Sequence, residues 1–150
     1  MESHLARAGY MADPDVLVLT EDRYGVEFIK NIINNLKDLN QVSRSRRIKV
    51  RWFPGKCNPK LYRILSAILI SARVIIMADA EGEDKTKVTQ QLWRHIPKEI
   101  RQNTCFIIFN YCIEEWVCDG LDISWNHLSP RDALNKYLLK RRGFKYEKYM

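Results

Sequence analysis

The chain has 150 residues, 46% of them hydrophobic, which suits one globular domain with its own core and excludes disorder over most of the chain. Its formal net charge of +7 favours an anionic partner such as nucleic acid, although many soluble proteins are basic without binding one.

Strand-like and helix-like patterns alternate along the chain. Residues 1–12 show no periodicity, and we expect a flexible leader there, followed by a single domain over residues 13–150. Short apolar runs predict strands over residues 16–20, 48–53, 73–78 and 104–109. Helical spacing and caps predict helices over residues 24–37, from Asn58-Pro59, from Asp84 to Pro97, and over residues 133–142 behind a Ser129–Asp132 cap.

This order of elements predicts an α/β protein with a three-layer, Rossmann-like architecture and a central, mostly parallel four-stranded sheet. Helical connections between consecutive strands make those strands parallel, because the chain must return to the same edge before each strand. The run Arg73–Ala78 is the most hydrophobic of the four, and we expect it at the centre of the sheet.

The remaining composition bears on the cellular setting. The longest apolar stretch, residues 64–78, contains Arg73 and two serines and is too short to span a bilayer. No secretory signal is visible at the N-terminus. The four cysteines match no zinc or redox spacing, so we expect reduced thiols, a cytoplasmic protein and no membrane partner.

Acidic residues follow three of the predicted strands. Glu21 comes after the first strand, Asp79 and Glu81 after the third, and Glu114 just past the fourth. The carboxyl ends of parallel strands meet at one edge of a sheet, so we expect these carboxylates to converge. A hard cation that prefers oxygen ligands, Mg²⁺ or Mn²⁺, would offset their mutual repulsion. The alternative is that they are acids at helix starts, which favour the positive end of the helix dipole.

Basic residues are concentrated in two segments. Each segment is either a solvated face or a surface that follows a phosphate backbone with little sequence preference. Arg23, beside the first acid, contacts a phosphate or forms a salt bridge with Asp22 or Asp79. The first segment contains Arg44, Arg46, Arg47, Lys49 and Arg51, and the second contains Lys136, Lys140, Arg141, Arg142, Lys145 and Lys148.

The acidic pattern resembles the Toprim domain of topoisomerases, primases and OLD-family nucleases. That domain has a Glu after its first strand and an Asp-x-Asp after a later one. Val-Leu-Thr-Glu21 and Ile-Ile-Met-Ala-Asp79-Ala-Glu81 fill those places here, with Glu replacing the second Asp. Three further short motifs of small Toprim-like proteins occur in order, so that the resemblance covers about residues 15 to 149: Gly55-Lys56, Ile113-Glu114-Glu115-Trp116 and Tyr146-Glu147-Lys148.

The resemblance implies roles for individual residues. Asp79 and Glu81 would bind the metal, and Glu21 would be a ligand or the general acid/base. Glu114 would contact the metal or a water, unless it only begins a helix with Trp116 packed beneath it. Lys148 would reach the scissile phosphate, and otherwise it is a solvated lysine near the C-terminus. The same two interpretations hold for Lys56.

The sequence therefore predicts a Toprim-type nuclease that hydrolyses phosphodiester bonds in DNA or RNA with Mg²⁺ or Mn²⁺. Two alternatives stay open. The first is a non-catalytic nucleic-acid-binding module. The second is a subunit of a larger nuclease or defence complex with an ATPase partner, because OLD-type Toprim domains are fused to one.

Overall fold

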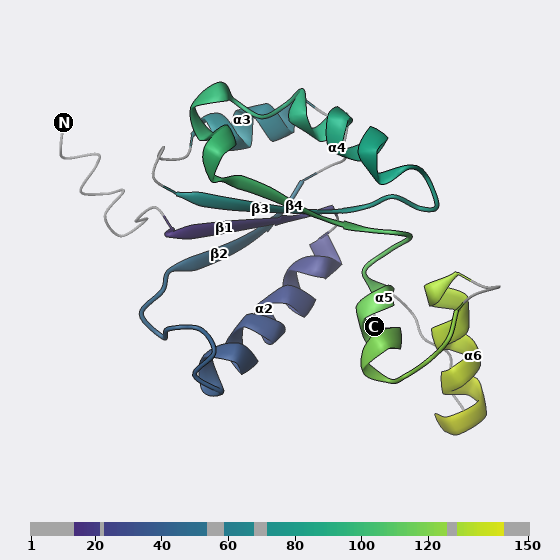
Figure 1. Ribbon diagram of the computed structural model, residues 1–150. Coiled ribbons are helices and arrows are strands. Elements are labelled where there is room, and N and C mark those ends of the chain that lie inside the picture. The colour runs from purple at the N-terminus through teal and green to yellow at the C-terminus, as the bar shows by residue number, and fades with distance from the viewer. Residues whose placement is uncertain (1–13, 22, 54–58, 68–71, 126–128, 143–150) are drawn as a thin grey trace.

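The computed structural model describes residues 14–21, 23–53, 59–67, 72–125 and 129–142. Four strands form one sheet in the order β2-β1-β3-β4, and every neighbouring pair is parallel (Figure 1). The prediction of an α/β fold with a parallel four-stranded sheet is confirmed, with β3 inside the sheet as expected. The strands are β1 (Val16–Thr20), β2 (Ile48–Trp52), β3 (Arg73–Asp79) and β4 (Thr104–Phe109).

Helices cover both faces of the sheet and so form three layers (Figure 1). In that view α2 lies below the sheet, α3 and α4 lie above it, and α5 and α6 lie beside the end at which β4 leaves. The helices are α2 (Arg23–Asp38), α3 (Lys60–Ser66), α4 (Lys85–Trp93), the 3-10 helix η1 (Lys98–Asn103), α5 (Glu114–Gly120) and α6 (Pro130–Arg142).

The two layers follow from alternation along the strands, because successive side chains of a strand point to opposite faces. Leu17 and Leu19 of β1 belong to the core that packs against α3 and α4. Val18 belongs to the second core, together with Ile29 of α2 and Met77 of β3. Both faces of the sheet are therefore apolar, as expected for parallel strands between helices.

Two of the predicted N-terminal caps are confirmed, whereas α3 begins after Pro59, at Lys60, and α4 ends at Trp93, before Pro97. The Asp84 side chain accepts a hydrogen bond from Thr86 N at 2.9 Å and begins α4. The Ser129 hydroxyl accepts one from Asp132 N at 3.1 Å and begins α6. These oxygens satisfy backbone N–H groups that have no partner inside the helix.

The sequence did not predict η1, which has 6 residues. It offered a helix start at Glu114 as an alternative, and the 7-residue helix α5 begins at that residue. Helix α5 packs against α6 through a separate small core containing Cys118, Ala133 and Leu134. The Cys118 thiol also donates a hydrogen bond to Pro130 O, at 3.3 Å. Cys105, although it lies within an apolar run of the sequence, is exposed on the edge strand β4.

Among the described residues, no helix is long and apolar enough to cross a membrane. The expected leader, residues 1–12, lies outside the described residues.

Candidate functional site at the carboxyl edge of the sheet

Glu21 and Asp79 lie together where β1 and β3 end. The register pairs Thr20 with Met77, so Glu21, which follows β1, and Asp79, the last residue of β3, lie close together at one edge of the sheet. The backbone N–H of Asp79 donates a hydrogen bond to Glu21 Oε1 at 2.6 Å. This contact fixes the orientation of the Glu21 carboxylate across two strands that are 58 residues apart in the chain.

Both residues line a hollow of about 10 Å³. A cavity of that size holds about one water molecule or one small cation. Its walls come from the ends of the inner strands β1 and β3 and of the edge strand β4, from the first turn of α2 and from the segment before α5. The described lining residues are Thr20, Glu21, Gly25, Met77, Asp79, Phe109 and Ile113.

Gly25 lets α2 begin close to this edge. A Cβ atom at Gly25 would lie 3.2 Å from Thr20 Cβ and 3.3 Å from Thr20 Oγ1. Thr20 is buried at the end of a strand and has little freedom to move. The missing side chain at position 25 therefore allows the first turn of α2 to approach the hollow.

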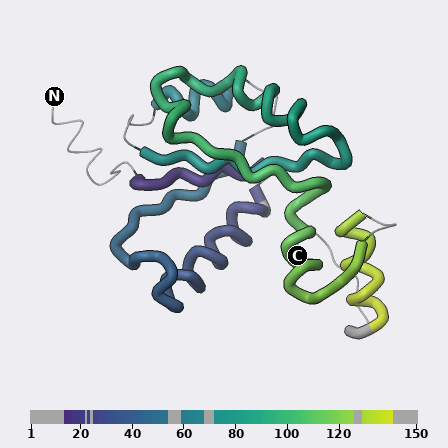
Figure 2. Tube along the Cα trace, in the orientation of Figure 1, coloured from purple at the N-terminus to yellow at the C-terminus, as the bar shows by residue number. Residues whose placement is uncertain are grey.

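Glu81 lies on the loop after β3. Hydrogen bonds join this loop to the end of β4 and the residues that follow it, and the two stretches of chain run side by side in Figure 2. Ala80 N donates to Phe109 O at 2.9 Å, and Gly82 N donates to Asn110 O at 2.8 Å. Glu81 is exposed and has a φ of +51°, a left-handed conformation that costs free energy for a residue with a side chain. The two loops thus hold Glu81 at the surface, two residues beyond Asp79.

Glu114 and Glu115 have different surroundings at the start of α5. Glu114 is 1% exposed, and its Oε2 lies 3.7 Å from Nε of Arg131 in α6. The Glu115 carboxylate accepts hydrogen bonds from the backbone N–H groups of Tyr111 and Cys112. Glu115 therefore stabilises the turn between β4 and α5, whereas Glu114 is paired with the neighbouring helix.

Cys112 connects this turn electrostatically to the end of β3. Burial raises the pKa of its thiol to about 12, and a hydrogen bond to Glu114 and the charges of Glu114 and Asp79 act in the same direction. Both carboxylates thus lie within electrostatic reach of one sulfur atom. Glu114 approaches the edge that carries Asp79, but its contacts are with Arg131 and Cys112.

The described residues contain no group of three or more His, Cys, Asp or Glu side chains close enough to hold a metal ion. Of the four acids predicted as ligands, the structure thus brings Glu21 and Asp79 to one hollow. It leaves Glu81 exposed on the adjoining loop and Glu114 buried against α6.

The first basic segment is divided between opposite edges of the sheet. Arg44 forms an ion pair with Asp38 at 3.1 Å, and Arg47 forms one with Asp15 at 3.1 Å, a contact that lowers the pKa of Asp15. These residues and Arg46 precede β2 and lie at the amino edge. A five-residue strand spans about 17 Å, so they lie roughly that far from the edge that carries Glu21.

Several predicted residues are beyond what the structure describes. Lys56 and Lys148 lie outside the described residues, as do the side chains of Arg141 and Arg142. Arg23 is exposed at the start of α2, and its guanidinium carbon lies 5.4 Å from the centre of the Trp52 ring. Trp52 is thus one partner of Arg23 among the described residues, and Asp22, a salt-bridge partner considered for it, lies outside them.

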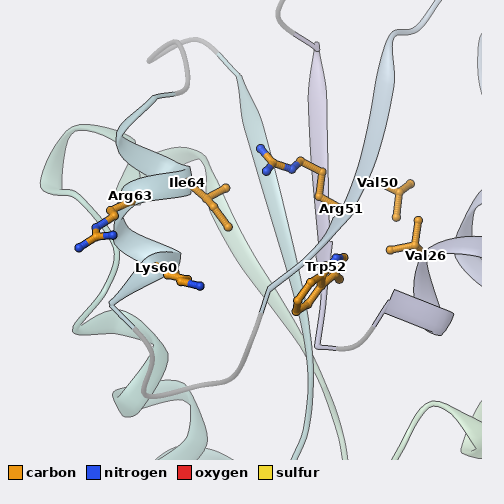
Figure 3. Close-up of a pocket in the computed structure, with 7 residues that line it drawn as sticks. All are labelled: Val26, Val50, Arg51, Trp52, Lys60, Arg63 and Ile64. Atoms are coloured by element: carbon orange, nitrogen blue, oxygen red, sulfur yellow. The ribbon is translucent and has the colours of Figure 1, made fainter.

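A larger hollow, of about 530 Å³, lies beside Trp52 at the exposed edge of β2 (Figure 3). Of its described lining residues, Arg51 belongs to the first basic segment, for which a phosphate contact was one interpretation, whereas Trp52, Lys60 and Arg63 were given no role. The run Lys49-Val50-Arg51-Trp52 at the end of β2 is the signal that would have indicated this hollow, because proteins that bind single-stranded nucleic acid combine basic residues with aromatic rings. The described lining residues are Val26, Val50, Arg51, Trp52, Lys60, Arg63 and Ile64.

Comparison of the chain with protein-family models, with curated proteins and with solved structures finds no match.

Proposed function

We propose that the protein is a metal-dependent phosphodiesterase that acts on nucleic acid, with Mg²⁺ or Mn²⁺ held by Glu21 and Asp79. One observation carries this proposal. Glu21 and Asp79 come from the ends of two parallel strands, are joined by a hydrogen bond, and line one hollow of about 10 Å³.

The donor set suits Mg²⁺, which commonly binds proteins through one or two carboxylates and completes its shell with waters and substrate phosphates. Two carboxylates therefore suffice without a third protein ligand. Glu81 is a further candidate, because it is exposed two residues beyond Asp79. Glu114 is a weaker one, because Arg131 and Cys112 already engage its carboxylate.

A bound metal would supply an activated water and would neutralise charge on the phosphate. The protein's own contribution begins with the Asp79 N–H, which holds the Glu21 carboxylate in one orientation. By the Toprim resemblance, Glu21 would accept or donate a proton at the reacting oxygen. Lys148 is proposed to stabilise charge on the phosphate. The cations near the end of β2 would hold the flanking backbone.

A second candidate function is a non-catalytic nucleic-acid-binding module, alone or as a subunit beside an ATPase. The hollow at the β2 edge favours it, because three of its described lining residues are cations and none is a carboxylate. Such a module would bind nucleic acid without using Glu21 and Asp79.

Cleavage of end-labelled DNA and RNA oligonucleotides with Mg²⁺ or Mn²⁺ separates the two functions. For a nuclease we expect Glu21→Gln and Asp79→Asn each to lower the rate by at least about 100-fold, the scale of general acid–base catalysis. Glu99→Gln is the matched control, because Glu99 is an exposed acid in η1, before β4, at the opposite edge. Binding without cleavage by the wild-type protein would favour the module.

A further inference from the structure

The hollow at the β2 edge combines positive charge with an exposed aromatic ring. Figure 3 shows the Arg51 guanidinium and the Lys60 ammonium group extending into the space between β2 and α3, with Trp52 beside them. Arg51, Lys60 and Arg63 are all exposed. A volume of about 530 Å³ lies within the range of pockets that bind small organic ligands.

Trp52 differs from the other tryptophans in its contacts. It is the last residue of β2 and is 42% exposed. Its ring contact is with the Arg23 guanidinium, whose carbon lies 5.4 Å from the ring centre, and Trp52 also lines the hollow. The other three tryptophans pack edge-on against aromatic rings: Trp93 on Phe106, Trp116 on Phe109 and Trp125 on Tyr111.

We infer that this hollow binds an unpaired nucleotide of single-stranded nucleic acid, with the base stacked on Trp52 and the adjoining phosphates contacting Arg51 and Lys60. Proteins that bind single strands combine a cationic groove with aromatic rings on which bases stack. A base inside a duplex is already stacked on both neighbours, so only an unpaired base can use the indole. The shared chemistry of DNA and RNA, a π face and a phosphate, fits this site.

The hollow at the β2 edge adjoins the site that contains Glu21 and Asp79. The inference about the substrate that follows from this proximity rests on the proposed function, whereas the binding of a nucleotide at the hollow does not. Trp52 pairs with Thr20, the residue before Glu21, and neighbouring strands lie about 4.8 Å apart. A nucleotide on Trp52 would therefore place the following part of its strand near Glu21 and Asp79. The inferred substrate of the proposed phosphodiesterase is thus single-stranded.

Fluorescence anisotropy with labelled oligo-dT, oligo-U and a duplex, all in EDTA, tests this inference independently of any metal. We expect both single strands to bind more tightly than the duplex. Trp52→Ala should weaken single-strand binding by about 5- to 150-fold, the range measured for base–aromatic stacking, whereas Trp52→Phe should retain most of it. A difference between oligo-dT and oligo-U would identify the preferred sugar.

Salt dependence tests the cations. Arg51→Ala should lower the slope of log K against log salt by about 0.7, the value for one phosphate contact on a single strand. Lys98→Ala should leave the slope unchanged, because Lys98 is exposed in η1 at the opposite edge.

Three results would overturn the inference: Trp52→Ala binding as tightly as the wild-type protein, the duplex binding as tightly as the single strands, or Arg51→Ala leaving the slope unchanged. If Trp52→Ala fails to fold, the inference is tested by the salt dependence of binding by Arg51→Ala and by the preference of the wild-type protein for single strands over the duplex. Failure of the proposed catalytic site is seen separately, as cleavage retained by Glu21→Gln and Asp79→Asn in the presence of metal.

Discussion

Replacing Glu115 by alanine removes the carboxylate that holds the turn between β4 and α5. Glu115 is 7% exposed and accepts hydrogen bonds from the N–H groups of Tyr111 and Cys112. Hydrogen bonds to charged groups contribute about 1.5–3 kcal/mol each. Because Tyr111 lies partly at the surface, where water can replace the lost acceptor, we take the lower end for the pair, about 3 kcal/mol.

For a domain of this size, a loss of about 3 kcal/mol lowers the melting temperature by roughly 6–12 °C. Thermal unfolding followed by circular dichroism measures the shift. Glu115→Gln keeps one oxygen as an acceptor, so we expect about half the loss. Glu99→Ala, at an exposed acid of η1, should change stability by less than about 0.5 kcal/mol. Equal melting temperatures for Glu115→Ala and Glu99→Ala would refute the structural role of this carboxylate.

Three further predictions concern residues near the site. Below pH 9.0 the Cys112 thiol is protonated in both the folded and the unfolded state. As the pH rises from 9.0 to about 12, only the unfolded state loses this proton, so the stability of the folded state should fall over this range. Urea unfolding at each pH measures the fall, which should be smaller in Cys112→Ala. Peptide mapping after alkylation at pH 8 should find Cys105 modified and Cys112 unmodified in the folded protein, and equal modification would contradict its burial. Gly25→Ala should destabilise the protein by about 1–2 kcal/mol in urea unfolding, because the cost of overpacking against Thr20 exceeds the helix-propensity gain of alanine. A gain in stability would contradict this and show that the Thr20 side chain moves to make room for the added methyl group.

The sequence predicted the fold well because its longer elements have clear periods. The limits of β1 and β4 match the structure, and β2 and β3 differ by one residue, Phe53 and Asp79. Phe53 was expected to be in β2 because it is apolar, and its N–H does bond to Thr20 O at 2.8 Å. The short helix η1 was missed and α5 was considered only as a helix start at Glu114, because so few residues give a weak helical period, whereas the equally short α3 was predicted with the help of Asn58-Pro59 before it.

The site was predicted in part, for reasons that lie in tertiary contacts. The order of the strands in the sheet places Glu21 beside Asp79. The alternation of strands and helices along the chain was enough to predict this proximity, because it predicts parallel strands whose carboxyl ends meet at one edge. Nothing in the sequence indicates that Glu114 meets Arg131, because that contact depends on how α6 packs against α5. The basic segment from Arg44 to Arg51 is continuous in sequence, but an extended strand carries its two ends to opposite edges of the sheet.

Thermal unfolding in increasing Mg²⁺ or Mn²⁺ tests most directly whether Glu21 and Asp79 hold one cation. Binding to the folded state at ten times the dissociation constant stabilises it by about 1.4 kcal/mol, which raises the melting temperature by roughly 3–6 °C. We predict this rise for the wild-type protein and for Glu99→Gln, and no rise for Glu21→Gln or Asp79→Asn. An unchanged wild-type melting temperature up to millimolar metal, or the same rise in all four proteins, would contradict the proposed site.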